Sequence, residues 1–132
     1  MESETPNELT QVDLDTLELA AQNDGFRTAD VKWRGLEGKR LNSEAIDAFD
    51  QNLILDIWRC VRTFNDFNAK DDPWGEHDFG RFEHPVVGLV FWKIDYYNLD
   101  YSGPSPDPFD ADQTARVLNV MLASEVEDLK RT

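Results

Sequence analysis

The clearest hydrophobic pattern lies in the middle of the chain, where apolar residues recur at intervals of three and four. This spacing places apolar side chains on one face and predicts a helix over residues 43–67. Ser43 and Asp50 are both suited to cap its start, because their side-chain oxygens accept hydrogen bonds from free backbone N–H groups. The stripe consists of Ile46, Phe49, Leu53, Ile57, Val61 and Phe64.

A different pattern follows in residues 86–97, which are rich in β-branched and aromatic side chains, as is typical of a central strand. Residues 79–83 can pair with this strand as a hairpin that turns at His84-Pro85. Because side chains alternate along a strand, the sequence predicts two faces. One face consists of Val90, Trp92, Ile94 and Tyr96, and the other of Leu89, Phe91, Lys93, Asp95 and Tyr97.

The ends of the chain carry shorter patterns. Residues 14–21 predict a short helix that Asn23-Asp24-Gly25 ends, and residues 26–33 predict a short strand. Near the C-terminus, an apolar stripe predicts a helix over residues 111–129, with Asp110 and Gln113 as its capping box. This second stripe consists of Leu118, Met121, Leu122, Val126 and Leu129.

These elements predict a small single-domain α+β fold with an antiparallel sheet packed by two main amphipathic helices, residues 43–67 and 111–129. The domain is expected to span residues 18–132, after a flexible acidic leader over residues 1–17.

Composition adds a strong negative charge, since the 132 residues include 27 Asp plus Glu and 13 Lys plus Arg, for a net charge of −14. A hydrophobic content of 40% is too high for a disordered acidic tail. The negative field argues against direct binding of nucleic acid. One cysteine excludes an intrachain disulfide framework, and no apolar run is long enough for a membrane span. We therefore expect a cytoplasmic protein without a membrane partner.

The charge is segregated along the chain. Residues 1–26 contain seven acidic residues and no Lys or Arg, and residues 94–115 contain five and again no Lys or Arg. Such a distribution can be recognised by a basic partner, although high net charge also simply favours solubility. With Trp74, which lies in a polar turn, the candidate partner-binding residues are Glu76, Asp100, Asp107, Asp110 and Asp112.

The densest polar cluster is the stretch DDPWGEHDFG at residues 71–80. Carboxylates with an imidazole suit Mg²⁺, Mn²⁺, Ca²⁺ or Zn²⁺, but the spacing matches no known ligand motif. The alternative is an Asx-rich turn whose carboxylates accept backbone N–H groups. We favour the turn and expect no cofactor. The alternative metal ligands are Asp72, Glu76, His77 and Asp78.

An acid/base site is the other chemical possibility. Lys93 and Asp95 share a predicted strand face, where they could transfer protons or simply form an ion pair. If the 71–80 turn folds onto this strand, a catalytic pocket would join His77, Asp78, Lys93, Asp95 and Tyr97. No motif for covalent catalysis surrounds Cys60 or the serines.

Several ordered motifs resemble one known family. They are NDGFR at 23–27, FNDF at 64–67, DDPWGEHDFG at 71–80, FWKIDYY at 91–97, SPDP at 105–108 and TARVLNVMLASE at 114–125. Together they are similar to a family of small bacterial proteins described only as a domain of unknown function, found in alphaproteobacteria, their plasmids and their phages. The resemblance covers about residues 18–126, and it implies no established activity.

Two hypotheses of function follow. The first is a small acidic protein that binds and inhibits a basic partner, such as a nucleic-acid-binding effector or nuclease. The occurrence of the family on mobile elements suggests, by analogy, a nucleic-acid mimic that acts against CRISPR or restriction systems. The second is a small metal-dependent or acid/base enzyme centred on the EHD motif at residues 76–78 with Lys93 and Asp95. We favour the binding protein over the enzyme, and the sequence leaves the oligomeric state open.

Overall fold

The computed structural model describes residues 9–28 and 36–126. The elements, in chain order, are α1 (Gln11–Thr28), β1 (Glu37–Asn42), α2 (Glu44–Asp47), α3 (Gln51–Thr63), β2 (Phe79–His84), β3 (Gly88–Tyr97), the 3-10 helix η2 (Ala111–Gln113) and β4 (Ala115–Leu122). They form one small α+β domain, as the sequence predicts. In the part of the chain that the structure describes, no helix is long and apolar enough to cross a bilayer.

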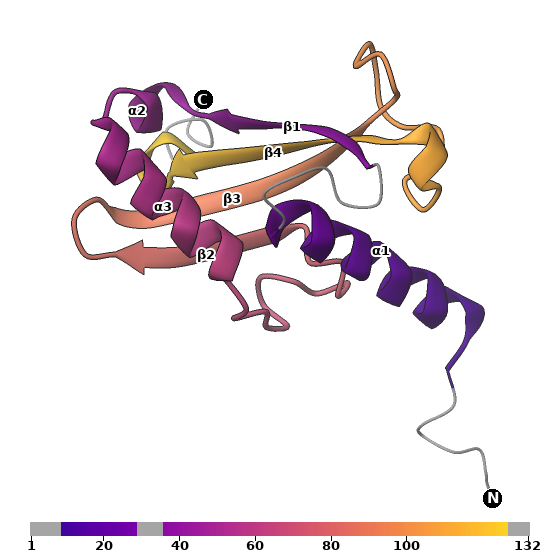
Figure 1. Cartoon of the computed structure of the whole chain (residues 1–132). Coiled ribbons are helices and arrows are strands. Elements are labelled where there is room, and N and C mark those ends of the chain that lie inside the picture. Colours follow the sequence, from indigo (N-terminus) through magenta and orange to yellow (C-terminus); the bar gives the residue numbers. More distant parts are fainter. Residues whose placement is uncertain (1–8, 29–35, 127–132) are drawn as a thin grey trace, which may run out of the picture.

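The four strands form a single sheet in the order β1-β4-β3-β2 (Figure 1). β2 and β3 form the predicted hairpin, and β3 pairs antiparallel with β4. β1 pairs with β4 in parallel, so the sheet is mixed and the prediction of an antiparallel sheet is wrong. β1 was missed because it is an edge strand with mostly exposed polar residues and therefore lacks an apolar alternation.

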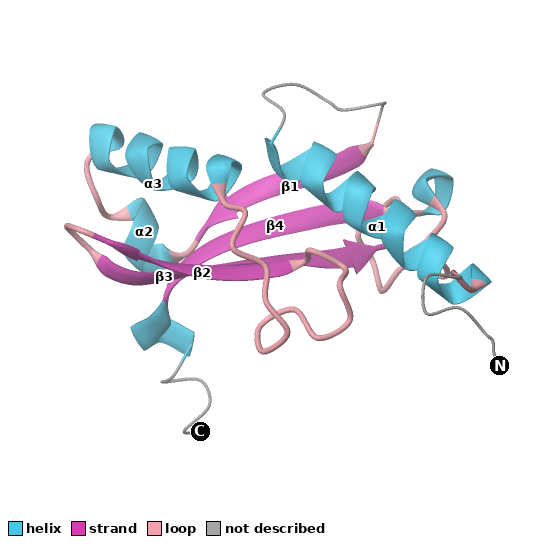
Figure 2. Cartoon of the chain, turned by 90° about the horizontal axis from the view of Figure 1, so that it is seen from below, coloured by secondary structure: helices cyan, strands magenta, loops and turns pink. Residues whose placement is uncertain are grey.

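The hydrophobic core lies between one face of the sheet and the helices α1 and α3, which both cover that face (Figures 1 and 2). The strand face predicted from the sequence is the inner one, since Val90, Trp92 and Ile94 are fully buried. The core cluster consists of Phe26, Leu36, Ile46, Ile54, Ile57, Val61, Val90, Trp92, Ile94, Leu118 and Val120.

The helix predicted over residues 43–67 exists as two pieces. Ser43 caps α2 by accepting a hydrogen bond from the Ile46 amide, and Asp50 caps α3 by accepting one from the Leu53 amide. Both candidate caps are therefore used, and the chain breaks between them. The break changes the direction of the chain, so that α3 alone lies along the sheet (Figure 1).

The helix predicted over residues 111–129 is wrong. Residues 115–122 form β4, a central strand, and Asp110 caps only the three-residue η2. Helical structure follows at residues 123–126, while Leu129 lies outside the described residues. A central strand buried on both faces has a nearly continuous apolar run, and such a run also fits helical spacing.

The N-terminal prediction also needs correction. α1 continues through Asn23-Asp24-Gly25 to Thr28, so Phe26–Thr28 are helical and not a strand, while residues 29–33 lie outside the described residues. Residues 11–17, which we assigned to the leader, form the first part of α1, and residues 1–8 are not described. The helix continues past Asn23 because the Asn23 side chain bonds to Glu76 and Tyr96 instead of forming a local turn.

Candidate functional site

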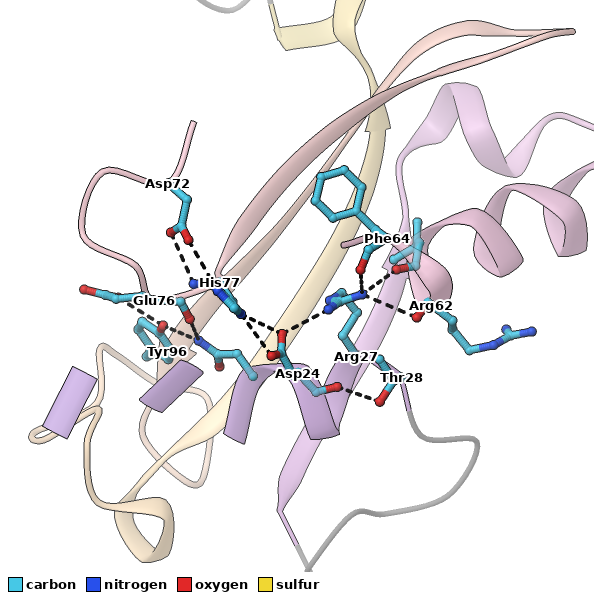
Figure 3. A network of polar contacts seen from close by, with 11 residues as sticks. Asp24, Arg27, Thr28, Arg62, Phe64, Asp72, Glu76, His77 and Tyr96 are labelled. Atoms are coloured by element: carbon cyan, nitrogen blue, oxygen red, sulfur yellow. Dashed lines mark hydrogen bonds and ion pairs between the residues drawn. The ribbon is translucent and has the colours of Figure 1, made fainter. Parts of the chain in front are cut away.

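The turn at residues 71–78 packs against the C-terminal half of α1 (Figure 3). The Asp72 side chain is buried, and its Oδ1 accepts a hydrogen bond of 3.2 Å from the His77 amide. The Gly75 amide donates to the Asp72 carbonyl at 3.1 Å. Gly75 and His77 both have positive φ angles, of 71° and 57°. The Asx-rich turn that we favoured is thus formed, with Asp72 as its internal acceptor.

The His77 imidazole lies between two carboxylates. Its Nδ1 is 2.9 and 3.0 Å from the two carboxylate oxygens of Asp24, and its Nε2 is 3.8 Å from Oδ2 of Asp72. The ring also stacks on Phe67, with a centroid distance of 3.8 Å and an interplanar angle of 3°. These contacts fix the orientation of the ring and connect the turn to α1.

Arg27 connects the same carboxylate to α3. Its Nη2 donates to Oδ1 of Asp24 at 3.0 Å, and its Nη1 donates to the carbonyls of Val61 at 2.8 Å and Phe64 at 3.0 Å. These carbonyls are at the C-terminal end of α3, where backbone acceptors lack helical partners and a cation is favoured. The side chain is only 2% exposed, and this burial lowers the pKa of the guanidinium.

A second set of hydrogen bonds joins α1 to the sheet. Nδ2 of Asn23 donates to the Glu76 carbonyl at 2.9 Å and to the Tyr96 hydroxyl at 2.8 Å. The Tyr96 hydroxyl donates in turn to Oε1 of Glu76 at 3.2 Å. Arg116, fully buried on β4, donates to Oδ1 of Asn23 at 2.8 Å and to Oε1 of Gln22 at 2.6 Å. The turn, α1, β3 and β4 therefore form one polar network.

The network makes two carboxyl groups unusually weak acids. Burial, reinforced by the negative charge of Asp78, raises the pKa of Glu76. Burial likewise raises the pKa of Asp78, although Lys93 acts in the opposite direction. Burial also raises the pKa of the Tyr96 phenol well above its usual range, so this hydroxyl stays protonated. Shifts of this kind are common at functional sites and in structural networks alike.

Replacing Glu76 by glutamine is expected to raise the melting temperature at pH 7. The pKa of Glu76 is higher in the folded than in the unfolded chain, so its contribution to stability is present below the unfolded value of about 4.3 and is lost as the pH rises through the folded pKa. Glutamine still accepts a hydrogen bond from Tyr96 and cannot ionise. Thermal unfolding followed by circular dichroism at several pH values should show that the gain disappears below about pH 4.

Glu44→Gln, on the exposed surface of α2, is the matched control because it removes the same charge away from the network. If Glu76→Gln lowers the melting temperature at pH 7, or raises it no more than Glu44→Gln does, the ionised Glu76 carboxylate does not destabilise the folded protein.

The structure separates His77 from Lys93, Asp95 and Tyr97, whereas the Asp78 carboxyl is close enough to Lys93 and Asp95 for their charges to affect its pKa. Lys93 and Asp95 form an ion pair with each other on the outer face of the sheet, where Tyr97 also lies. His77 lies on the inner side, because it stacks on Phe67, which packs against the buried Trp92. Of the alternative metal ligands, Asp72 and His77 lie close together, whereas the Glu76 carboxylate bonds to Tyr96.

Among the described residues, one group of three potential ligands has its donor atoms within 4.8 Å of one another: Asp56, Cys60 and His84. Nδ1 of the buried His84 accepts a hydrogen bond of 3.1 Å from the Val86 amide, so Nε2 carries the proton and donates to Oδ2 of Asp56 at 2.7 Å. A metal-bound imidazole donates from its second nitrogen, which conflicts with this amide. Asp56 also accepts hydrogen bonds from the Arg59 guanidinium. The group is therefore a structural link between α3 and the hairpin.

The candidate partner-binding carboxylates lie mainly in the loop that joins β3 to β4. Asp100, Asp107 and Asp110 accept hydrogen bonds from backbone amides within this loop, which fixes its shape. These bonds, with those from Ser102 and Gln113 side chains, lower the pKa of Asp100 and Asp110, so both remain anionic. Asp112 is exposed.

The loop and the N-terminal half of α1 both extend past the end of the sheet at which β3 ends and β4 begins (Figures 1 and 2). The N-terminal half of α1 and the loop, neither of which contains Lys or Arg, thus lie at one end of the described structure. We call this region the acidic end; it carries Asp13, Asp15 and Glu18 of α1 and Asp100, Asp107, Asp110 and Asp112 of the loop.

An exposed apolar groove lies beside α1. Its lining includes Pro73, Trp74 and Gly75 of the turn and Leu9, Val12 and Leu17 of the N-terminal segment. We call it the Trp74 groove, and its volume is about 460 Å³. Trp74 is 78% exposed and Val12 is 72% exposed, which is unusual for large apolar side chains that lie together.

A family model described as a protein of unknown function, DUF3768, matches residues 42–125. The chain belongs to the DUF3768 family. The motifs that suggested a family of unknown function lie largely within this match, from FNDF to TARVLNVMLASE. No curated protein and no solved structure matches the chain.

The site crosses the boundary of the DUF3768 match. The 71–78 turn, α3, β3 and the loop lie inside it, whereas α1 with Asn23, Asp24 and Arg27 lies outside it. Sequence reasoning missed these three residues, because it interpreted Asn23 and Asp24 as helix-ending residues. No local pattern marks these residues, because their partners lie on the turn, α3 and the sheet, far away in the sequence.

Proposed function

We propose that this protein binds a partner protein through its acidic end. The observation that carries the proposal is that the N-terminal half of α1 and the β3–β4 loop, which are far apart in sequence and contain no Lys or Arg, extend past the same end of the sheet. Carboxylates at such a surface attract the lysines and arginines of a partner and accelerate association. The loop also exposes Leu99 and Phe109 beside its carboxylates, which adds apolar contact area.

In its finer form, the proposal identifies the partner as a cytoplasmic nucleic-acid-binding effector or nuclease that the acidic end inhibits. Lysines and arginines that bind phosphates also accept carboxylates, and a fixed carboxylate array can occupy a groove built for a nucleic acid. The rigid hydrogen bonding of Asp100, Asp107 and Asp110 supports this form, because the carboxylates are held before the partner arrives. An anti-defence role on a mobile element remains an analogy from the family.

The enzyme hypothesis has less support. The Asp24–His77 pair resembles an oriented base, but Nε2 of His77 faces the Asp72 carboxylate, and Lys93 lies on the other face of the sheet. A base needs its free nitrogen within reach of a substrate proton. The acidic end therefore provides the better-supported function.

The test compares three immobilised proteins that capture partners from a bacterial lysate: the natural chain, a site variant and a control variant. The site variant combines Asp100→Asn, Asp107→Asn and Asp112→Asn, because asparagine keeps a side-chain acceptor and removes the charge. The control variant combines Glu44→Gln, Asp47→Asn and Glu83→Gln, which removes three exposed charges on α2 and β2. Captured proteins are identified and quantified by mass spectrometry at increasing salt.

We expect a basic protein whose retention falls at least about tenfold with the site variant, stays unchanged with the control variant and decreases with salt. Equal losses with both variants would contradict the proposal, since only total charge would then matter. For the finer form, the natural chain must compete with duplex DNA for the captured protein. If the captured protein binds the natural chain and duplex DNA does not compete, the acidic end has a partner but does not mimic nucleic acid.

A further inference from the structure

The backbone of the turn that carries Trp74 is held in place by its neighbours. Asp72 bonds to the amide of His77, and His77 is held by Asp24, so both ends of the short turn around Trp74 are anchored to buried structure. A Cβ placed on Gly75 would lie 3.9 Å from Cγ2 of Thr16, which shows that the turn lies directly against α1. The network in Figure 3 therefore holds the turn that carries Trp74 against α1. A turn whose backbone is already ordered loses less entropy when a ligand binds to it.

The charge around this groove selects its occupant. Asp13 lines the groove, and hydrogen bonds from Thr10 lower its pKa, so it is anionic. Asp13 is the one charged residue of the groove lining, which contains no Lys or Arg. A volume of about 460 Å³ is within the range of sites that enclose a ligand group. An apolar groove with a carboxylate in its lining matches an apolar group that has a positive charge beside it.

We propose that the Trp74 groove binds a short peptide segment of the partner that carries one or two large apolar side chains flanked by lysines or arginines. The inference rests on the proposed function, because it assigns the anchoring contact of the same basic partner. In it, the apolar side chains pack on Trp74 and Val12, and a flanking cation pairs with Asp13 of α1. The acidic end then supplies attraction, and the groove supplies specificity.

The test uses two synthetic probes of equal length on the full chain. The first is a leucine–lysine peptide with leucines at three- and four-residue spacing, and the second is polylysine. Binding of each fluorescently labelled probe is measured by anisotropy at two salt concentrations. The variants are Trp74→Ala and Val12→Asn in the groove, with Leu55→Ala as a control, because Leu55 is a similarly exposed apolar residue on α3.

We expect the leucine–lysine peptide to bind the natural chain and Leu55→Ala equally, and to bind both groove variants at least about tenfold more weakly. Polylysine should bind all four proteins alike and more weakly. Equal binding of the leucine–lysine peptide to all four proteins would contradict the proposal for the groove without contradicting the proposal for the acidic end. Failure of both probes to bind the natural chain would contradict the proposed function as well.

Sedimentation equilibrium of the natural chain and of Trp74→Ala tests whether the groove binds a second copy of the chain instead of a partner. The proposal expects the same molecular mass for both proteins over the concentration range of the binding test. Self-association of the natural chain that Trp74→Ala abolishes would overturn the proposal, because the groove would then bind a second copy.

Discussion

Replacing Arg27 by alanine is expected to lower the free energy of unfolding by about 3–5 kcal/mol. The guanidinium is almost fully buried and donates hydrogen bonds to the Val61 and Phe64 carbonyls and to Asp24. Alanine leaves the two carbonyls without this donor at the end of α3 and removes a contact with the Trp92 ring, which lies 5.0 Å from the guanidinium carbon. Urea unfolding followed by circular dichroism measures the change.

Arg59→Ala provides the control for Arg27. Arg59 also pairs with a carboxylate three residues away, but it lies on the exposed surface of α3. Its removal is expected to leave the urea midpoint almost unchanged, because exposed ion pairs contribute little. A midpoint for Arg27→Ala equal to that of Arg59→Ala would show that the buried guanidinium does not connect α1 to α3 in solution.

Replacing Gly38 by alanine is expected to cost about 3 kcal/mol, at the upper end of the range for over-packing. A Cβ at this position would lie 2.3 Å from Cε1 of Phe26 and 2.7 Å from the backbone oxygen of Arg116. Neither atom can yield easily, since Phe26 is a core residue of α1 and the oxygen belongs to the central strand. α1 must move away from the sheet, which would also weaken the network around Asn23.

Two further variants test this cause. Gly103→Ala is the control, because a Cβ there would meet only Nδ2 of Asn98, at 3.9 Å, and we expect no loss of stability. Phe26→Leu should partly rescue Gly38→Ala, so the double variant would be more stable than the sum of the single changes indicates. Strict additivity would exclude the clash with Phe26 as the reason for the loss.

The parts of the fold that could be predicted are those with an unambiguous local pattern. The hairpin of β2 and β3 and the apolar face of α3 have periods of two and of three to four residues, which local sequence reveals. β4 could not be assigned, since a strand covered on both faces has no alternation. Its parallel partner β1 has too few apolar residues to mark it as a strand.

The candidate site, too, could be predicted only where its features are local in sequence. The polar turn at residues 71–78 and the charged segments were visible in the sequence, because both are local. Asp24 and His77 are 53 residues apart, and nothing in either local pattern indicates that they meet. The separation of His77 from Lys93 and Asp95 depended on which side of β3 the turn would reach. The stacking of His77 on Phe67, which follows α3, keeps His77 on the inner side of the sheet.

The order of the strands has a consequence for how the chain is made. β4 lies between β1 and β3 in space but follows both in the chain. During synthesis on the ribosome, β1 therefore has no strand to pair with until residues 115–122 have been made, whereas the hairpin of β2 and β3 can form earlier. Arg116, which bonds α1 to the central strand, also arrives with β4. The sheet can therefore gain β1 and these hydrogen bonds to α1 only after β4 has been synthesised.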